Sequence, residues 1–580
     1  MATVKHSKSS TIPVTPQETF RSLNSMVESH LDPVGLTTPL LHAQLAWLSH
    51  PQELSEALTV LAMKMWDFQT HAWNRAMGMP SDDVETPHPD DTRFVDPVWT
   101  DSATWDITKE WYLTLTHHVQ NMIYDTPGLS TKEKRKAAFW WRKWLNAMAP
   151  TNFFATNPVA QRLAMDSRGE SLIRGMRNFL QDIEAGTVRM TSPDDFQVGK
   201  NLATTPGKVV FRNRLLEVIH YAPTQAKVHS VPLVIVTPWI NKFYVLDLNP
   251  KKSMVKYLLD QGLDVFITSW KNPTAEYHDV SFDDYIVEGI GAAIDVACKL
   301  SGATQVNAVG YCIGGAALAT YMAWANRHYG ERKVPVESAT FLTTLVDYHH
   351  PGDIEVFLDE GTIEWLSRSM EEQGYLDGQQ MASAFRLLRS NSLIWHYVVH
   401  GYLYGEAPAP FDVLYWNMDT TRMPAAMHSW YLRQFYVDNN LIKPDALVVA
   451  GEPINLERIV QPIYAVSAED DHIAPWRQAF RIANYVEGEK RFVLSSSGHI
   501  LGIVNPVVHP PKREYWVGAA RRHDTADTWK KAASHHAGSW WEDWMVWLKP
   551  LSGELRAAPP VADAIFTALA DAPGTYVLER

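Results

Sequence analysis

The cysteine between two glycines at 310–314 constrains the fold of this chain most. Gly310-Tyr311-Cys312-Ile313-Gly314 follows a short apolar run and precedes a helical pattern that continues to about residue 323. The spacing is that of the G-x-S-x-G nucleophile elbow, with cysteine in the serine position. Glycine suits so sharp a strand-to-helix turn because a β-carbon would have little room there. The pattern predicts a nucleophilic Cys312 at a helix N-terminus, whose dipole favours a thiolate. The alternative is a buried structural cysteine.

Length, charge and cysteine content exclude several classes of protein. A chain of 580 residues is too long for one ordinary core, so we expect two or more units. The net charge of −13 argues against a dedicated nucleic-acid binder. Two cysteines exclude a disulfide framework, a four-cysteine zinc site and an iron–sulfur cluster, and they suit a reducing cytoplasm. We find neither a signal peptide nor an apolar run of about 18 residues, so no transmembrane segment is predicted.

The N-terminal third has a helical pattern and shows no catalytic chemistry. Residues 1–18 are rich in Ser, Thr, Lys and Pro, which predicts a disordered tail. Leucines at helical spacing predict a helical N-terminal domain over 19–200. Trp140, Trp141 and Trp144 follow a basic stretch at 132–136. Their spacing fits either a buried aromatic helix face or a docking face for a partner.

From about residue 201 the pattern changes to strands that alternate with helices. The predicted strands are 208–213, 216–221, 232–237, 264–269, 305–309, 339–346, 462–467 and 491–494. Two early strands followed by strand–helix alternation predict an α/β-hydrolase fold over 201–580, with a mostly parallel central sheet. A doubly wound nucleotide-binding fold has similar periodicity, but the chain lacks the glycine-rich phosphate loop that such a fold needs.

An α/β-hydrolase carries its acid and its histidine on loops after later strands. Asp471 follows the strand at 462–467, and His499 lies in a Gly-His turn directly after the strand at 491–494. We therefore predict Cys312, Asp471 and His499 as a catalytic triad. Asp470 is the rival acid, and either aspartate could instead cap the helix that begins near Pro475.

A long insertion separates the strands at 339–346 and 462–467. Residues 347–441 are rich in tryptophan and tyrosine and have helical and irregular patterns. In this fold an insertion at that point usually forms a cap over the nucleophile, where it excludes water and shapes an apolar acyl site. The alternative is a helical subdomain that packs away from the site.

Several long motifs resemble the polyhydroxyalkanoate synthases. The similarity covers roughly 91–548 and rests on stretches far more specific than the elbow: GYCIGGAAL at 310–318, TPWINKFYVLDL at 237–248, VFITSWKNP at 265–273, DDHIAPW at 470–476, SSSGHILGIVNP at 495–506, MAPTNFFATNP at 148–158, NLATTPGKVV at 201–210, GSWWEDWMVWL at 538–548 and the cap stretch at 411–441. The chain departs from the better-known members at 427–430, Met-His-Ser-Trp, where they carry Tyr-Cys before the tryptophan. This difference puts a role for a second thiol in the cap in doubt.

The resemblance implies an acyltransferase that polymerises (R)-3-hydroxyacyl-CoA into a polyester and releases coenzyme A. The family's cysteine, aspartate and histidine fall on Cys312, Asp471 and His499. The resemblance also implies a homodimer of the single-subunit type in the cytoplasm, bound to the surface of polyester granules with other granule-associated proteins. Coenzyme A is part of the substrate, and the chemistry requires no cofactor and no metal.

Three further residues complete the predicted site. The backbone N–H groups of Ile313 and Ile240 are expected to form an oxyanion hole. Trp416, in the most recognisable cap stretch, is expected to form a wall of the acyl site, unless it is a buried tryptophan of the cap core. Two other functions stay open on the same fold: a thioesterase or polymer depolymerase, which usually carries serine at the elbow, and a non-enzymatic granule scaffold.

Overall fold

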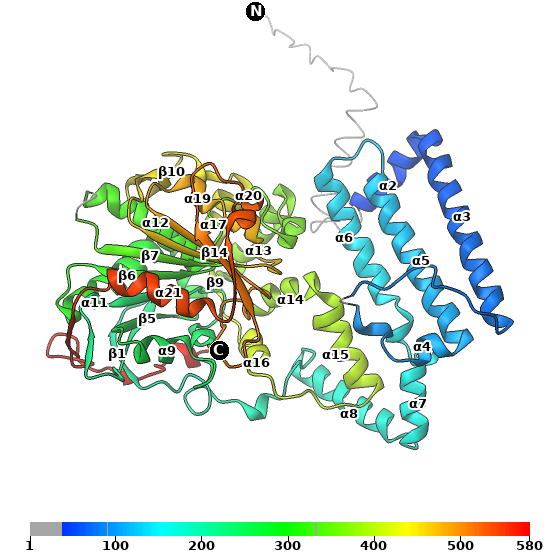
Figure 1. Cartoon of the computed structure of the whole chain (residues 1–580), viewed down its shortest axis with the longest axis horizontal. Coiled ribbons are helices and arrows are strands. Elements are labelled where there is room, and N and C mark those ends of the chain that lie inside the picture. Colours follow the sequence, from blue (N-terminus) through cyan, green and yellow to red (C-terminus); the bar gives the residue numbers. More distant parts are fainter. Residues whose placement is uncertain (1–37, 90, 331–332) are drawn as a thin grey trace, which may run out of the picture. The chain divides into compact units, whose positions relative to one another are not determined.

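The chain folds into two compact units (Figure 1). The computed structural model describes residues 38–89, 91–330 and 333–580. Of these residues, the first unit, here the helical unit, comprises those up to 92, 99–145 and 359–365, and the second, the sheet unit, comprises those of 93–98, 146–358 and 366–580. The predicted tail at 1–18 lies outside the described residues. The predicted domain limits at 200 and at 347–441 stay predictions.

The helical unit is built on long helices. They are α2 (Thr38–Ser49), α3 (Pro51–Ala76), α5 (Ala103–Asp125) and α6 (Thr131–Ala147), with the short α4 (Val98–Asp101) before α5. Helix α3 packs along α5. Between them, His71 Nε2 lies 3.0 Å from Asp106 Oδ2, and both side chains are buried. On α6, Trp140 is buried whereas Trp144 is 59% exposed.

A mixed sheet of eleven strands forms the centre of the described sheet unit, in the order β15-β14-β13-β12-β7-β6-β4-β5-β2-β1-β17. The six central strands are parallel: β5 (Val265–Trp270), β4 (Leu233–Val236), β6 (Val306–Tyr311), β7 (Val336–Leu342), β12 (Ile463–Ala468) and β13 (Lys490–Ser495). Antiparallel strands extend both edges: β1 (Gly207–Arg212), β2 (Leu216–Tyr221), β17 (Ala570–Asp571), β14 (Glu514–Ala519) and β15 (Ser534–Ala537). All eight predicted strands are present, and the α/β class with a mostly parallel centre is confirmed.

Strand β7 begins and ends earlier in the chain than the sequence predicts, at Val336 and Leu342. The prediction placed it at 339–346, but it ends at Leu342. The next residue, Thr343, has a φ of 43° and donates its N–H to the carbonyl of Val466. Because a β-branched residue rarely adopts positive φ, an apolar threonine-rich pattern gives no warning of this turn.

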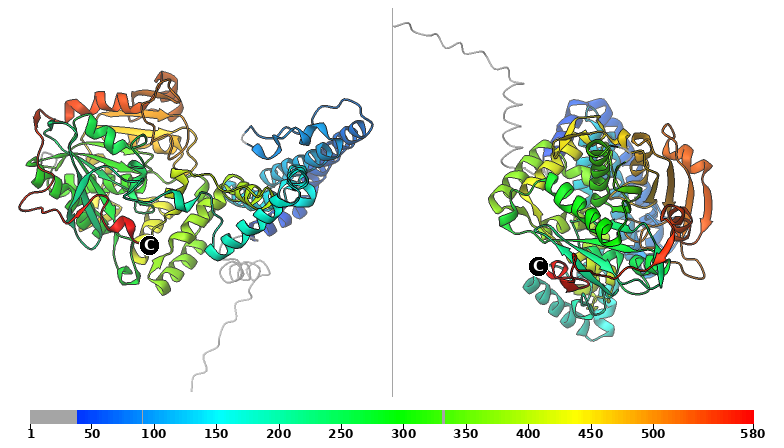
Figure 2. Two further views of the ribbon diagram at one scale, coloured as in Figure 1. Left: turned by 90° about the horizontal axis from the view of Figure 1, so that it is seen from below. Right: turned by 90° about the vertical axis from the view of Figure 1, so that its left-hand side faces the viewer.

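Helices pack on the sheet and share its core (Figure 2). Helices α9 (Met254–Asp260) and α21 (Trp540–Leu548) belong to one buried cluster with the central strands, whereas α12 (Ile313–His328) packs against β4, β6 and β7. Trp540 and Trp541 of α21 donate their indole N–H groups to the carbonyls of Gly502 and Ile503, at 2.9 and 3.0 Å. These tryptophans therefore support the loop that follows His499.

The insertion after β7 is helical and rich in aromatic residues, as predicted. Its helices are α13 (Glu360–Gln373), α14 (Gly378–Leu388), α15 (His396–Val398), α16 (Asp412–Met418) and α17 (Ala425–Tyr431), and wider π-helical turns at Val399–Leu403 and Leu432–Val437 follow α15 and α17. Upstream, α7 (Pro158–Asp166) and α8 (Glu170–Ala185) also belong to the sheet unit.

The glycines of the elbow are required by close packing. A β-carbon on Gly314 would lie 2.6 Å from the carbonyl oxygen of Val236 and 2.7 Å from that of Thr237. A β-carbon on Gly310 would lie 2.5 Å from the Cα of Gly315. The first turn of α12 therefore lies directly against the end of β4, and only glycine permits this approach.

Gly314→Ala should lower the free energy of unfolding by about 1–3 kcal/mol, since its methyl group would collide with backbone carbonyls that cannot rotate away. Chemical denaturation of the purified protein measures this change. Gly401→Ala is the matched control, because a β-carbon there meets nothing within 4 Å. Equal stability of the two variants would contradict the packing argument.

Candidate active site

Cys312 occupies a strained turn between β6 and α12. Its φ of 54° and ψ of −122° are unusual for a residue with a side chain, as expected at a nucleophile elbow. The Cys312 N–H donates to the carbonyl of Leu342 at the end of β7, over 2.9 Å. Ile313 begins α12, so its N–H has no partner four residues earlier in the helix. The structure thus presents the sulfur and a free backbone donor at one helix N-terminus.

Asp471 and His499 meet at the carboxyl ends of β12 and β13. His499 Nδ1 lies 2.6 Å from Asp471 Oδ2, and both side chains are at least 92% buried. The other carboxylate oxygen of Asp471 accepts the N–H groups of Ile473 and Ala474, at 2.8 and 2.9 Å. Asp471 therefore orders the loop before α18 (Trp476–Ala479) and holds the imidazole at the same time.

The rival acid, Asp470, is exposed to solvent, whereas Asp471 is buried against His499. Its N–H donates to the carbonyl of Ser497, so it contributes backbone order to the histidine loop. Geometry thus favours Asp471 over Asp470 as the partner of the imidazole. The two aspartates are adjacent, and sequence alone left them as alternatives.

The electrostatic environment favours a charged His499. Burial opposes the imidazolium, but the charges of Asp471 and Cys312, with hydrogen bonds to both side chains, raise the pKa of His499 to about 10. A raised pKa means that the imidazolium is retained through neutral pH. The neighbouring His472 behaves oppositely: burial and the positive charge of Arg389 lower its pKa to about 4. His472 is therefore neutral, whereas His499 can hold a proton beside the sulfur.

Sequence reasoning missed Tyr311 as part of this site. Its buried hydroxyl donates to the carbonyl of His499 over 3.3 Å, and the two rings stack with centroids 5.8 Å apart. Tyr311 directly precedes Cys312, and its position as the last residue of strand β6 was the signal available in the sequence. It connects the elbow to the histidine loop.

Three cap tyrosines approach the nucleophile and were also missed. The hydroxyls of Tyr348 and Tyr431 lie 3.3 Å apart, and the ring of Tyr436 contacts both. Burial raises the pKa of all three phenols, and the charge of Cys312 adds to the rise in each. These tyrosines therefore lie within electrostatic range of the sulfur and remain neutral hydrogen-bonding groups.

The other predicted site residues have clear positions. Ile240 lies in the turn that follows β4, and the end of β4 contacts Gly314 in the first turn of α12, which Ile313 begins. Trp416, on α16, is 3% exposed and donates its indole N–H to the carbonyl of Lys242 over 2.6 Å. It belongs to the main buried cluster of the sheet unit. Its predicted contact with substrate stays a prediction.

Among the described residues, one cluster of three carboxylates has ligand atoms close enough together to hold a cation. Ligand atoms of Asp83, Asp106 and Glu110, in the helical unit, lie within 4.8 Å of one another. The ammonium of Lys109 already lies 3.1 Å from Asp106 and 3.2 Å from Glu110. A buried lysine thus supplies the positive charge that these carboxylates require.

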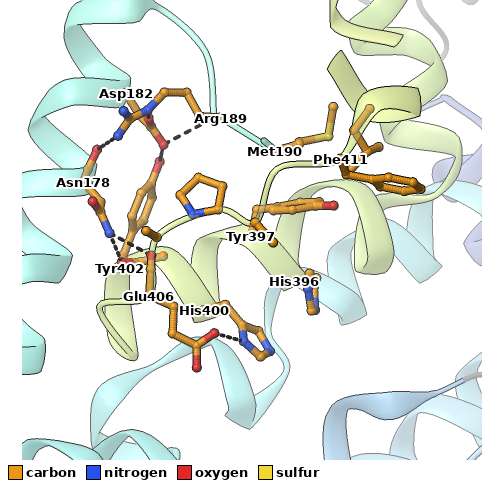
Figure 3. A pocket seen from close by; sticks show the side chains of 15 residues that line it. Asn178, Asp182, Arg189, Met190, His396, Tyr397, His400, Tyr402, Glu406 and Phe411 are labelled. Carbon is orange, nitrogen blue, oxygen red and sulfur yellow. Dashed lines mark hydrogen bonds and ion pairs between the residues drawn. The ribbon is translucent and has the colours of Figure 1, made fainter. Parts of the chain in front are cut away.

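A separate pocket of about 230 Å³ lies between α8 and the segment 396–414 (Figure 3). Asp182 accepts hydrogen bonds from Arg189 and Tyr402, and His400 pairs with Glu406 over 2.7 Å. None of the predicted triad residues lines this pocket.

Among the described residues, no helix combines the length and apolar character that a membrane crossing requires.

The fold and the elbow define an α/β-hydrolase-fold protein. The sequence model of that fold matches residues 232–506, and the model described as the N-terminus of poly-beta-hydroxybutyrate polymerase matches residues 90–258.

Curated relatives extend this similarity over nearly the whole chain. The poly(3-hydroxyalkanoate) polymerase of Methylorubrum extorquens is 41% identical over 93% of this chain and 89% of its own. The polymerase subunit PhaC of Rhizobium meliloti is 40% identical, over 97% of this chain and 91% of its own. The corresponding subunit of Cupriavidus necator is 39% identical, over 84% and 83%. The chain belongs to the poly(3-hydroxyalkanoate) polymerase family.

Asp471→Asn should lower the pKa of His499, because the carboxylate makes the largest of the contributions that raise it. The imidazolium would then be lost at a lower pH. Nitrogen NMR of histidine-labelled protein, with the His499 signal assigned from His499→Gln, measures the titration. Asp470→Asn is the matched control and should leave it unchanged. An unaltered titration in Asp471→Asn would contradict the electrostatic account.

Proposed function

We propose that this protein polymerises (R)-3-hydroxyacyl-CoA into a polyester, releasing coenzyme A through an acyl-Cys312 intermediate. The carrying observation is the arrangement of Cys312 at the elbow with the buried His499–Asp471 pair, 2.6 Å apart. Membership of the polymerase family supports the product class. 3-Hydroxybutyryl-CoA is the first substrate to test.

The acylation step follows from the site. His499 holds the proton of the Cys312 thiol as an imidazolium, and the Cys312 thiolate attacks the thioester carbonyl. Asp471 keeps the imidazole oriented and stabilises its charge. The N–H groups of Ile313 and Ile240 would stabilise the oxyanion. The carbon–sulfur bond to coenzyme A breaks, and the departing thiolate takes the proton from His499.

Elongation returns the site to its starting state. His499 takes the proton of a 3-hydroxyl group, whose oxygen attacks the acyl-Cys312 carbonyl. The new ester forms as the bond to sulfur breaks, and Cys312 leaves as a thiolate that pairs with the protonated His499. Acyl-cysteine is itself a thioester, so exchange with the substrate thioester is nearly isoenergetic and conserves acyl activation. No metal or redox cofactor takes part in this proposed cycle.

The cap would protect the acyl-enzyme from water. Tyr348, Tyr431 and Tyr436 form a packed aromatic cluster near Cys312. Such a cover favours attack by a hydroxyl over hydrolysis, because it excludes bulk solvent from the reactive thioester. Trp416 is proposed to form a wall of the acyl site or to support the residues that form it.

The proposed product is an insoluble polyester, and this determines the partners and the location that we assign to the protein. We include in the proposal a homodimer in the cytoplasm that stays attached to its growing polyester chain and to the granule surface, together with other granule-associated proteins. The family resemblance supports these assignments.

Cys312→Ala should reduce release of coenzyme A from 3-hydroxybutyryl-CoA by at least about 1,000-fold, since it removes the nucleophile. Free thiol and insoluble polymer are measured together. Coenzyme A with polymer supports a polymerase, coenzyme A with soluble acid would indicate a thioesterase, and neither product would indicate a scaffold. Cys298→Ala is the control and should remain active, because burial and the charge of Asp295 raise the pKa of that thiol to about 11.

The cap at 347–441 should limit access to Cys312. In a Cys298→Ala background, a bulky thiol reagent should label the resting protein slowly and label it faster with a non-reactive acyl-CoA analogue bound beside the sulfur. The reason is that a seated lid must open for substrate. Mass spectrometry measures the labelling rate. Rapid labelling without the analogue would show that the cap does not gate the site.

A further inference from the structure

The turn Trp239–Lys242, which carries the proposed oxyanion donor Ile240, is held by side chains of the cap. The buried hydroxyl of Thr421 donates to the carbonyl of Trp239 over 2.5 Å. At the other end of the turn, the indole of Trp416 donates to the carbonyl of Lys242 over 2.6 Å. Cap residues thus fix both ends of a turn that belongs to the sheet unit's catalytic core.

The bond from Thr421 acts on the peptide group that bears the oxyanion donor. The carbonyl of Trp239 and the N–H of Ile240 belong to the same peptide unit, which is planar and trans. In a trans peptide these two groups point in opposite directions, so fixing the oxygen fixes the direction of the N–H. A hydroxyl on one side of the turn therefore determines where the Ile240 donor points on the other.

Surrounding contacts prevent the turn from rotating as a whole. The Lys242 ammonium, almost fully buried, lies 2.7 Å from Asp419 Oδ1 and donates to the carbonyl of Glu579 over 2.9 Å. Asn241 forms an isolated antiparallel bridge with Thr420. The Trp239 ring packs against Tyr285 with centroids 4.7 Å apart. With these anchors in place, the remaining freedom is rotation of the Trp239–Ile240 peptide plane, which Thr421 restrains.

We propose that Thr421 is a positioning residue that aligns the Ile240 N–H with the oxyanion formed on Cys312. This inference rests on the proposed function, since it concerns the acylation step. The cap then does more than cover the site: while Thr421 is seated on Trp239, the donor is aligned, and displacement of this cap segment misaligns it. Cap closure and catalytic competence become linked through one hydrogen bond.

Two reactions of the Cys312 sulfur distinguish an effect of Thr421 on the oxyanion donor from an effect on the fold around the sulfur. Acylation by an acyl-CoA develops an oxyanion and needs the donor, whereas alkylation by iodoacetamide displaces iodide at a saturated carbon and develops none. Both rates are measured in a Cys298→Ala background, where Cys312 is the reporting thiol. Thr421→Val removes the hydroxyl with little change in shape, and Thr421→Ser keeps it.

Single-turnover acylation should fall about 10- to 100-fold in Thr421→Val, the scale of a misaligned oxyanion donor. Alkylation should stay within about twofold of the parent rate, and Thr421→Ser should recover most of the acylation rate. The matched control is Thr191→Val: Thr191 is also buried and donates to a loop carbonyl, that of Ala409, over 3.0 Å. It should change neither rate.

Three results would overturn the proposal: parent-rate acylation in Thr421→Val, an equal loss of alkylation, or no recovery in Thr421→Ser. Equal loss of both reactions would assign the hydroxyl to the fold around Cys312. Failure of the proposed function has a different signature, because the parent protein would then be alkylated normally but would not be acylated.

Discussion

The approach of helix α12 to the ends of β4 and β7 is the constraint on which the site depends. Gly314 lies so close to the carbonyls of Val236 and Thr237 that no side chain fits. This contact fits the sharp turn of the chain at Cys312, where α12 begins with an N–H group that has no partner within the helix. The same contact places the end of β4, from which the turn at 239–242 continues, against the first turn of α12. Nucleophile and proposed oxyanion donors are thus assembled by backbone packing before any side-chain chemistry.

The electrostatic environment gives neighbouring groups of the site different protonation states. Asp471 and Cys312 raise the pKa of His499, whereas burial and Arg389 lower that of His472, so two histidines on adjoining loops hold different charges at neutral pH. The cap adds neutral hydroxyls instead of further charge. A site with one retained proton beside buried, neutral phenols is suited to acyl transfer, where water would divert the intermediate.

Local patterns in the sequence predicted the central strands, the elbow and the order of Cys312, Asp471 and His499, because each depends on residues adjacent in the chain. The edge strands β14, β15 and β17 were missed: β15 is polar and exposed, and β17 has two residues. The cap contacts were missed for a different reason. Tyr348 and Tyr431 are 83 residues apart, and Thr421 and Trp239 are 182 apart, so only the folded chain reveals that they meet. The catalytic roles themselves stay predictions.

The central claim is that Cys312 carries the acyl group. Butyryl-CoA lacks the 3-hydroxyl needed for elongation, so the acyl-enzyme should accumulate when the purified protein is mixed with it and quenched in acid. Intact-protein mass spectrometry followed by peptide mapping should show one butyryl group per chain, on Cys312. A butyryl group on another residue, or release of coenzyme A with no protein adduct at any time point, would contradict the account.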